Sequence, residues 1–198
     1  MFVGVDPDLH NTGIAVIDND GKCVLACSCK VSRQLKGRSA CIEMAEEIRK
    51  AAVNVNAIAG ALYETGRDVK ASVLCVEGQE LYRGNDAATK NPRSILFLAS
   101  VAGAALGAIP AHAKMFPSPQ EWKGSIPKEI KQARILLEAG WDIGKAAGYC
   151  YPQHLPFGLN KGDWKHVTDA LGLAQWARSQ WIAKSRRQSY LQKKSTIF

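Results

Sequence analysis

The 198-residue chain has the length of one domain with a full core, and its 46% hydrophobic and 22% charged residues are typical of an ordinary soluble protein. The formal net charge of +8 favours an acidic partner, most commonly nucleic acid. No apolar run approaches the roughly 20 residues of a membrane span, and the N-terminus enters a strand without a signal-peptide layout. We therefore expect a cytoplasmic protein with no membrane partner.

The six cysteines indicate free thiols rather than disulfides or a zinc site. They lie mostly in apolar strand-like or helical stretches, and the spacing Cys27-x-Cys29 matches no zinc pattern. Buried thiols of this kind are typical of a reducing cytoplasm.

The first elements along the chain predict an antiparallel meander. Apolar runs at Phe2–Asp6 and Gly13–Ile17 predict two strands. The turn sequence Asp18-Asn19-Asp20-Gly21 then leads into a third strand over Lys22–Val31.

The rest of the chain predicts helices alternating with strands. The first is a helix over Lys36–Ala52, and Ala57–Leu62 either extends it or forms a second short helix. The elements that follow, in order, are a buried strand Ser72–Val76, a helix from Asn91-Pro92 through Gly107, a strand Ala113–Phe116, a basic helix Lys128–Ala139, a loop Gly144–Gly162 and a last helix Asp163–Ile182. This order predicts an α/β fold with a mixed five-stranded sheet, an antiparallel meander plus parallel strands, flanked by helices.

We expect residues 1–198 to form a single domain. Its residues 184–198 are expected to be a basic tail that can be flexible. From Arg178 onward the chain carries six basic residues and no acid. Such a segment suits a solubilising end and a phosphate contact equally well.

Acidic residues close two of the predicted strands, and a third acid lies on the last helix. Asp6 ends the first strand and Glu77 follows the buried strand, while His166 and Asp169 share one face of the helix because they are three residues apart. Hard divalent ions bind such oxygen ligands. The alternative for Asp6 alone is a strand-ending turn, and for Glu77 alone it is a solvated strand end. For Asp163 we favour a helix N-cap over a water-mediated metal contact.

This set of residues can support phosphodiester hydrolysis. Two divalent ions held about 4 Å apart stabilise the attacking and leaving oxygens of such a displacement. His166 could bind a metal ion when neutral or hold the attacking water as a base.

Basic residues around Trp122 are expected to contact phosphates near this site. For Lys131 and Arg134 a solvated helix face is an equal alternative. The two further candidates are Lys123, held between Trp122 and Gly124, and Lys128.

Four motifs in this order resemble the RuvC-type Holliday junction resolvases of the RNase H-like superfamily. The motifs are Gly4-Val5-Asp6-Pro7 with Thr12-Gly13, Val76 through Asn85, Pro119 through Lys131, and His166-Val167-Thr168-Asp169-Ala170-Leu171. Each motif is loose alone, but the four together span nearly the whole chain.

The resemblance implies an RNase H-like fold and a homodimeric, DNA-associated endonuclease. Such an enzyme makes paired nicks across a four-way DNA junction with Mg²⁺ or Mn²⁺, and the resemblance implies two ions per active site. The metal-binding and catalytic positions of the family then fall on Asp6, Glu77, His166 and Asp169.

The segment after Glu77 departs from the family pattern. Family members often place an aromatic wedge just after this acid, where Glu80 and Leu81 stand here, and Tyr82 is the first aromatic. Leu81 or Tyr82 is expected to take over that role, with Arg83 as a further DNA contact.

Other functions stay open at this point. Without a wedge, a less selective nuclease for branched DNA such as forks and flaps is favoured. An RNase H-like ATPase or sugar kinase would need two phosphate loops that are not evident, and a junction-binding protein without catalysis is disfavoured by the complete set of acids.

Overall fold

A mixed five-stranded sheet forms the centre of the computed structural model, which describes residues 1–63, 71–78, 92–141, 143–146, 149–152, 159 and 162–195. Its strands are β1 (Phe2–Asp6), β2 (Asn11–Ile17), β3 (Cys23–Lys30), β4 (Ala71–Val76) and β5 (Ala111–Met115). They lie in the order β3-β2-β1-β4-β5. The first three strands pair antiparallel, whereas β1–β4 and β4–β5 are parallel. The predicted fold class is therefore confirmed.

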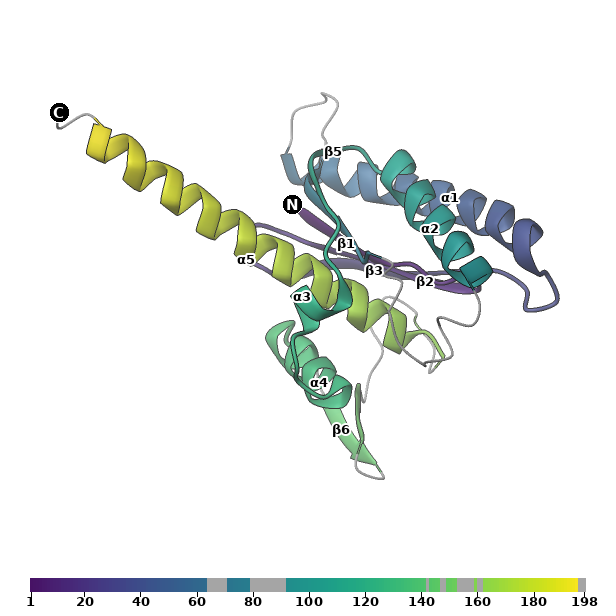
Figure 1. Ribbon diagram of the computed structural model, residues 1–198. Helices are drawn as coiled ribbons and strands as arrows, with labels where there is room; N and C mark the ends of the chain where they lie inside the picture. Colours follow the sequence, from purple (N-terminus) through teal and green to yellow (C-terminus); the bar gives the residue numbers. More distant parts are fainter. Residues whose placement is uncertain are drawn as a thin grey trace.

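Helices cover both faces of the sheet (Figure 1). They are α1 (Gly37–Tyr63) and α2 (Pro92–Ala108) on one face and α5 (Trp164–Ser195) on the other, and α3 (Pro119–Lys123) and α4 (Lys128–Glu138) pack against α5. The alternation of side chains along each strand divides the core in two. In β1, Val3 and Val5 pack in the cluster with α1 and α2, whereas Phe2 packs in the cluster with α5.

Two glycines allow α5 to lie directly on the backbone of the sheet. A Cβ built on Gly4 of β1 would meet the carbonyl oxygen of Ala170 at 1.9 Å. A Cβ on Gly13 of β2 would meet the carbonyl oxygen of His166 at 2.2 Å. No other amino acid fits at either position without moving the helix. This close approach places the first turns of α5 beside the end of β1.

The predicted helix Lys36–Ala52 and the segment Ala57–Leu62 form one continuous helix, α1. The alternative of a second short helix is therefore wrong. The reason is the uninterrupted apolar face, because Ala52, Val55 and Ala59 continue the buried face of the first turns.

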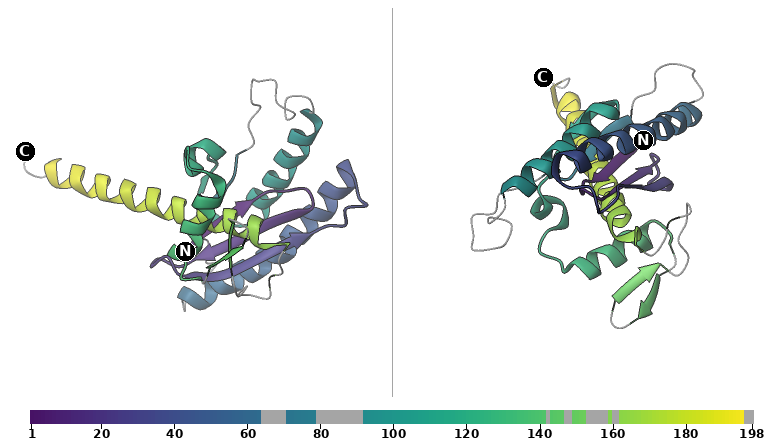
Figure 2. Two further views of the ribbon diagram at one scale, coloured as in Figure 1. Left: turned by 90° about the horizontal axis from the view of Figure 1, so that it is seen from below. Right: turned by 90° about the vertical axis from the view of Figure 1, so that its right-hand side faces the viewer.

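The structure corrects three other predicted segments. The predicted loop Gly144–Gly162 contains an antiparallel hairpin of β6 (Ile143–Ala146) and β7 (Tyr149–Pro152). Helix α3 was not predicted, although Ser118 and Glu121 form a capping box at its start. Helix α5 continues to Ser195, so it includes residues 184–195 of the predicted tail, and it projects beyond the rest of the molecule (Figure 2). Its apolar face ends early, but no glycine or proline follows to stop it.

The thiols of five cysteines are free in the structure, as predicted: Cys23, Cys27, Cys29, Cys41 and Cys75. The side chain of Cys150 lies outside the described residues. None of the helices within the described ranges is long and apolar enough to cross a membrane.

Candidate active site

The first two carboxylates of the site lie side by side because their strands are parallel neighbours. Val5 pairs with Val76, so Asp6 and Glu77 lie next to each other at the C-terminal ends of β1 and β4. The backbone N–H of Glu77 donates to the carbonyl of Val5 at 3.1 Å, which extends the pairing by one residue. Both acids are about 7% exposed, so they are largely shielded from water.

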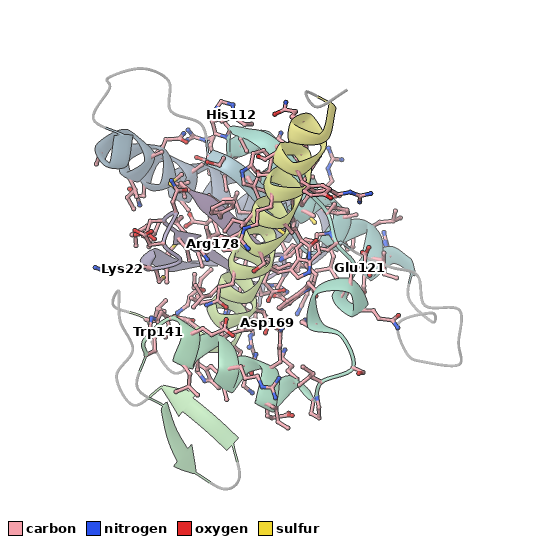
Figure 3. The ribbon with its side chains drawn as sticks, turned by 90° about the vertical axis from the view of Figure 1, so that its left-hand side faces the viewer. Lys22, His112, Glu121, Trp141, Asp169 and Arg178 are labelled. Carbon is pink, nitrogen blue, oxygen red and sulfur yellow. The ribbon has the colours of Figure 1, made fainter. Side chains whose placement is uncertain are left out.

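Helix α5 brings His166 and Asp169 to these carboxylates. His166 Nδ1 lies 2.9 Å from Asp6 Oδ2. Asp169 follows one turn later and is 3% exposed. Figure 3 shows Asp169 on α5 beside α3 and α4. The structure therefore brings together all four residues that the sequence predicted for the site.

Helix α3 supplies a lysine and a tryptophan that bind Glu77. Lys123 Nζ lies 2.9 Å from Glu77 Oε1 and 3.5 Å from Asp169 Oδ2, so its ammonium group joins the strand acid to the helix acid. Trp122 Nε1 donates to Glu77 Oε1 at 3.1 Å. The Lys123 ammonium also lies 4.6 Å from the Trp122 ring centroid, within the range of a cation–π contact.

Helix α4 holds Asp169 from the other side. Gln132 Nε2 donates to Asp169 Oδ1 at 2.8 Å, and Lys128 Nζ lies 3.0 Å from Asp169 Oδ2. Both oxygens of this carboxylate are thus bonded, which fixes its orientation.

The ionisable groups of the site shift one another's pKa values in a buried place. Burial raises the pKa of Asp6 to about 8; the neighbouring Glu77 and Asp169 add to the rise, and the hydrogen bond with His166 opposes it. That same hydrogen bond with Asp6 raises the pKa of His166 against the effect of burial. Burial works to lower the pKa of Lys123, but Asp169 and Glu77 outweigh it, and the pKa is raised.

The donor set suits a hard divalent cation, although the side chains do not enclose one in this arrangement. Within the described part of the chain, no three Asp, Glu, His or Cys side chains converge as a metal cluster. The Lys123 ammonium instead lies between Glu77 and Asp169, and both carboxylates bind it through oxygen. A positive charge is thus already accommodated among oxygen ligands of the type that Mg²⁺ prefers.

Other residues predicted for the site lie around it. Lys131 and Asp169 line the same pocket, and Arg134 is exposed on α4. Asp163 directly precedes α5, as an N-cap would, and its carboxylate lies 2.7 Å from Lys30 Nζ. The predicted DNA contacts Leu81, Tyr82 and Arg83 lie outside the described residues.

The sequence did not predict Gln132 or the hydrogen bond from Trp122. A signal for Gln132 was present, because it precedes Ile135 and Leu136 at helical spacing on the buried face of α4. A glutamine on an apolar helix face needs a buried partner, and here the partner is a carboxylate.

Comparisons with known proteins place this fold. No protein-family model and no curated protein matches the sequence. The chain is similar to Thermus thermophilus RuvC in complex with a Holliday junction substrate, with 19% identity over 91% of this chain and 94% of that chain and a TM-score of 0.51. A second RuvC structure from this organism has 19% identity over 91% and 95% of the two chains, with a TM-score of 0.47. The yeast mitochondrial Holliday junction resolvase Ydc2 has 12% identity over 96% and 82%, with a TM-score of 0.45. The sheet, its helices and the first of these similarities together show that the chain has the RNase H-like fold of RuvC.

Proposed function

We propose that the protein is a divalent-metal-dependent endonuclease that resolves four-way DNA junctions by hydrolysing phosphodiester bonds. The observation that carries this proposal is the buried meeting of Asp6, Glu77 and Asp169 with the Lys123 ammonium between two of them. A protein of net charge +8 with buried acids at the ends of two strands and on the helix beside them is suited to an acidic substrate that reacts with the help of cations.

The three carboxylates would hold the metal, with His166 as a fourth ligand or as the partner of Asp6. Mg²⁺ or Mn²⁺, as two ions, would lower the pKa of an attacking water and neutralise the leaving oxygen. Trp122 and Gln132 fix the orientation of Glu77 and Asp169 through hydrogen bonds. Supporting contacts of this kind orient ligands before the cation arrives.

The lysines of the site have two successive roles in this proposal. Lys123 and Lys128 neutralise Glu77 and Asp169 in the free protein. With cations held by the carboxylates, the two ammonium groups would be available to the phosphate oxygens of the substrate. The long lysine side chain allows this change of partner without a change in the backbone.

The choice of a four-way junction rests on the fold and on its structural neighbour. RuvC, whose fold the chain shares, has been solved in complex with a Holliday junction substrate. Paired nicks at a symmetric junction require two active sites, so the proposal includes a homodimer. The wedge candidates Leu81 and Tyr82 follow Glu77 by four and five residues in the sequence.

A cleavage panel tests this function. Synthetic four-way junctions, forks, flaps and plain duplex are incubated with Mg²⁺, with Mn²⁺ or with EDTA. Symmetric paired nicks confined to the junction, and absent in EDTA, are expected. Equal cutting of forks and flaps would replace junction resolution with a general branched-DNA nuclease. Binding without cleavage under both metals would refute the nuclease.

A further inference from the structure

A second group of basic residues lies around a pocket beside His166, outside the cluster of carboxylates. The pocket has a volume of about 610 Å³, within the range of ligand sites. It is formed where the end of β3 and the segment before α1 meet the start of α5. Its charged and ionisable lining includes Lys30, Arg33, Lys36, Asp8, Asp163 and His166.

The two acids of this pocket are already engaged by donors. Asp8 Oδ1 accepts the backbone N–H groups of His10 and Asn11 at 2.8 and 3.0 Å. Asp163 Oδ2 lies 2.7 Å from Lys30 Nζ, and the Lys30 side chain is still 48% exposed.

Arg33 and Lys36 are the uncommitted charges of the pocket. Both are exposed, and neither has an acidic partner among the residues that the structure describes. An arginine and a lysine in such a place are available to an anion from solution.

A second basic pocket borders the carboxylates at Asp169. It has a volume of about 370 Å³ and is lined by Lys123, Lys128, Lys131 and Asp169. His166 borders the first pocket and Asp169 the second, and these residues are one turn apart on α5. At a rise of about 1.5 Å per residue, the two pockets approach the site from adjacent turns of one helix. The site thus has one basic pocket at His166, the partner of Asp6, and another at Asp169.

We infer that the pocket at Arg33 and Lys36 binds backbone phosphates of the cleaved strand, on one side of the scissile bond. The pocket at Lys128 and Lys131 receives the strand on the other side. This inference rests on the proposed nuclease function. A strand whose scissile phosphate lies at the carboxylates must leave the site in two directions, and the pockets at His166 and at Asp169 offer a basic lining for each direction. Arg33 can bind two phosphate oxygens at once, whereas Lys36 supplies a point charge.

Charge-neutralising variants provide the first test. In the full-length protein, Arg33→Gln is combined with Lys36→Gln. The matched control is Arg49→Gln with Lys50→Gln, which removes the same two residue types from ion pairs with Glu46 and Glu47 on α1. Junction affinity is measured by fluorescence anisotropy in EDTA over a series of salt concentrations. The negative slope of log affinity against log salt concentration should become smaller in magnitude by about two in the pocket variant and remain unchanged in the control.

A second test locates the contact on the DNA. Single methylphosphonates, which lack the phosphate charge, are placed at successive positions on both sides of the cut. On one side, one or two of these positions should weaken wild-type binding and have little further effect on the pocket variant. The control variant should lose as much affinity as the wild type at those positions.

The outcomes separate this inference from the function on which it rests. If the wild type cuts junctions but the pocket variant matches the control in slope and in methylphosphonate response, the phosphate site is wrong and the nuclease stands. If the wild type neither binds nor cuts branched DNA, both proposals are wrong.

Discussion

Gly13 lies so close to His166 that a Cβ on the glycine would meet the carbonyl oxygen of the histidine at 2.2 Å. The helix that carries His166 and Asp169 therefore rests on the sheet backbone itself. The position of the candidate site depends on this contact, because the same turns of α5 meet Asp6 at the end of β1.

Gly13→Ala should destabilise the protein by about 3 kcal/mol or more, because the added carbon meets backbone atoms that cannot turn away. Urea denaturation of the metal-free protein measures the change. Gly103→Ala is the control, since Gly103 is exposed on α2 and a Cβ there has no atom within 4 Å. That variant should be stabilised by up to about 1 kcal/mol. Equal changes in the free energy of unfolding for the two substitutions would show that the backbone of α5 does not contact β2 at Gly13.

Gln132→Met should weaken Mn²⁺ binding by about 10- to 100-fold, because Asp169 loses the amide that orients it. Methionine has nearly the volume of glutamine, so the fold is retained. Calorimetric titration with Mn²⁺ gives the affinity. The control is Gln175→Met on α5, whose amide donates to the backbone carbonyl of Ile135 rather than to a carboxylate. Metal affinity unchanged by Gln132→Met would remove Gln132 from the site.

The metal-free protein should become less stable as the pH rises toward about 8. Asp6 loses its proton near pH 3.8 when unfolded but only at about 8 when folded, so the folded state binds more protons between these values. The hydrogen bond with Asp6 raises the pKa of His166 in the folded state. The stability that His166 contributes is therefore present at pH values below its ordinary pKa and is lost as the pH rises through the pKa of the folded state. Both groups act in the same direction.

Urea denaturation in EDTA between about pH 5 and pH 8 measures this dependence. Asp6→Asn removes the titrating carboxyl and the partner of His166, so its stability should change less with pH than that of the wild type. Parallel curves for the two proteins would contradict the raised pKa.

Alkylation should separate the cysteines by burial. Burial raises the pKa values of Cys23, Cys29 and Cys75 to about 12, so these thiols form little thiolate near neutral pH. Of the five cysteines whose side chains the structure describes, Cys41 on α1 is only partly buried and should react first. Short pulses of iodoacetamide followed by peptide mass spectrometry give the order. Labelling of Cys75 as fast as Cys41 would show that the centre of the sheet is open to solvent.

The sequence allowed the acids of the site to be found because strand ends and helical spacing are local signals. Asp6 and Glu77 each follow an apolar run, and parallel pairing of β1 with β4 brings them together. The spacing of His166 and Asp169 placed both on one face of α5. These patterns depend only on the periods of strands and helices.

The partners of the acids could not be predicted in the same way. Gln132 and Lys128 reach Asp169 because α4 packs against α5, a tertiary contact between segments more than thirty residues apart. Lys123, which the sequence predicts as a phosphate contact, binds Glu77 and Asp169 in the structure, and nothing in the sequence indicated these two partners. The pocket at Arg33 also depends on three segments that meet only in the fold.

The most direct test of the proposed active site separates binding from cleavage. Asp6→Asn and Asp169→Asn keep the size of each side chain and remove its charge, and Asp20→Asn at the exposed turn before β3 is the control. Each protein is assayed with a four-way junction for binding in EDTA and for nicking in Mg²⁺. We predict that both site variants bind the junction as tightly as the wild type and do not cut it, whereas Asp20→Asn binds and cuts normally. Nicking by Asp6→Asn at the wild-type rate in Mg²⁺ would contradict the assignment of this site.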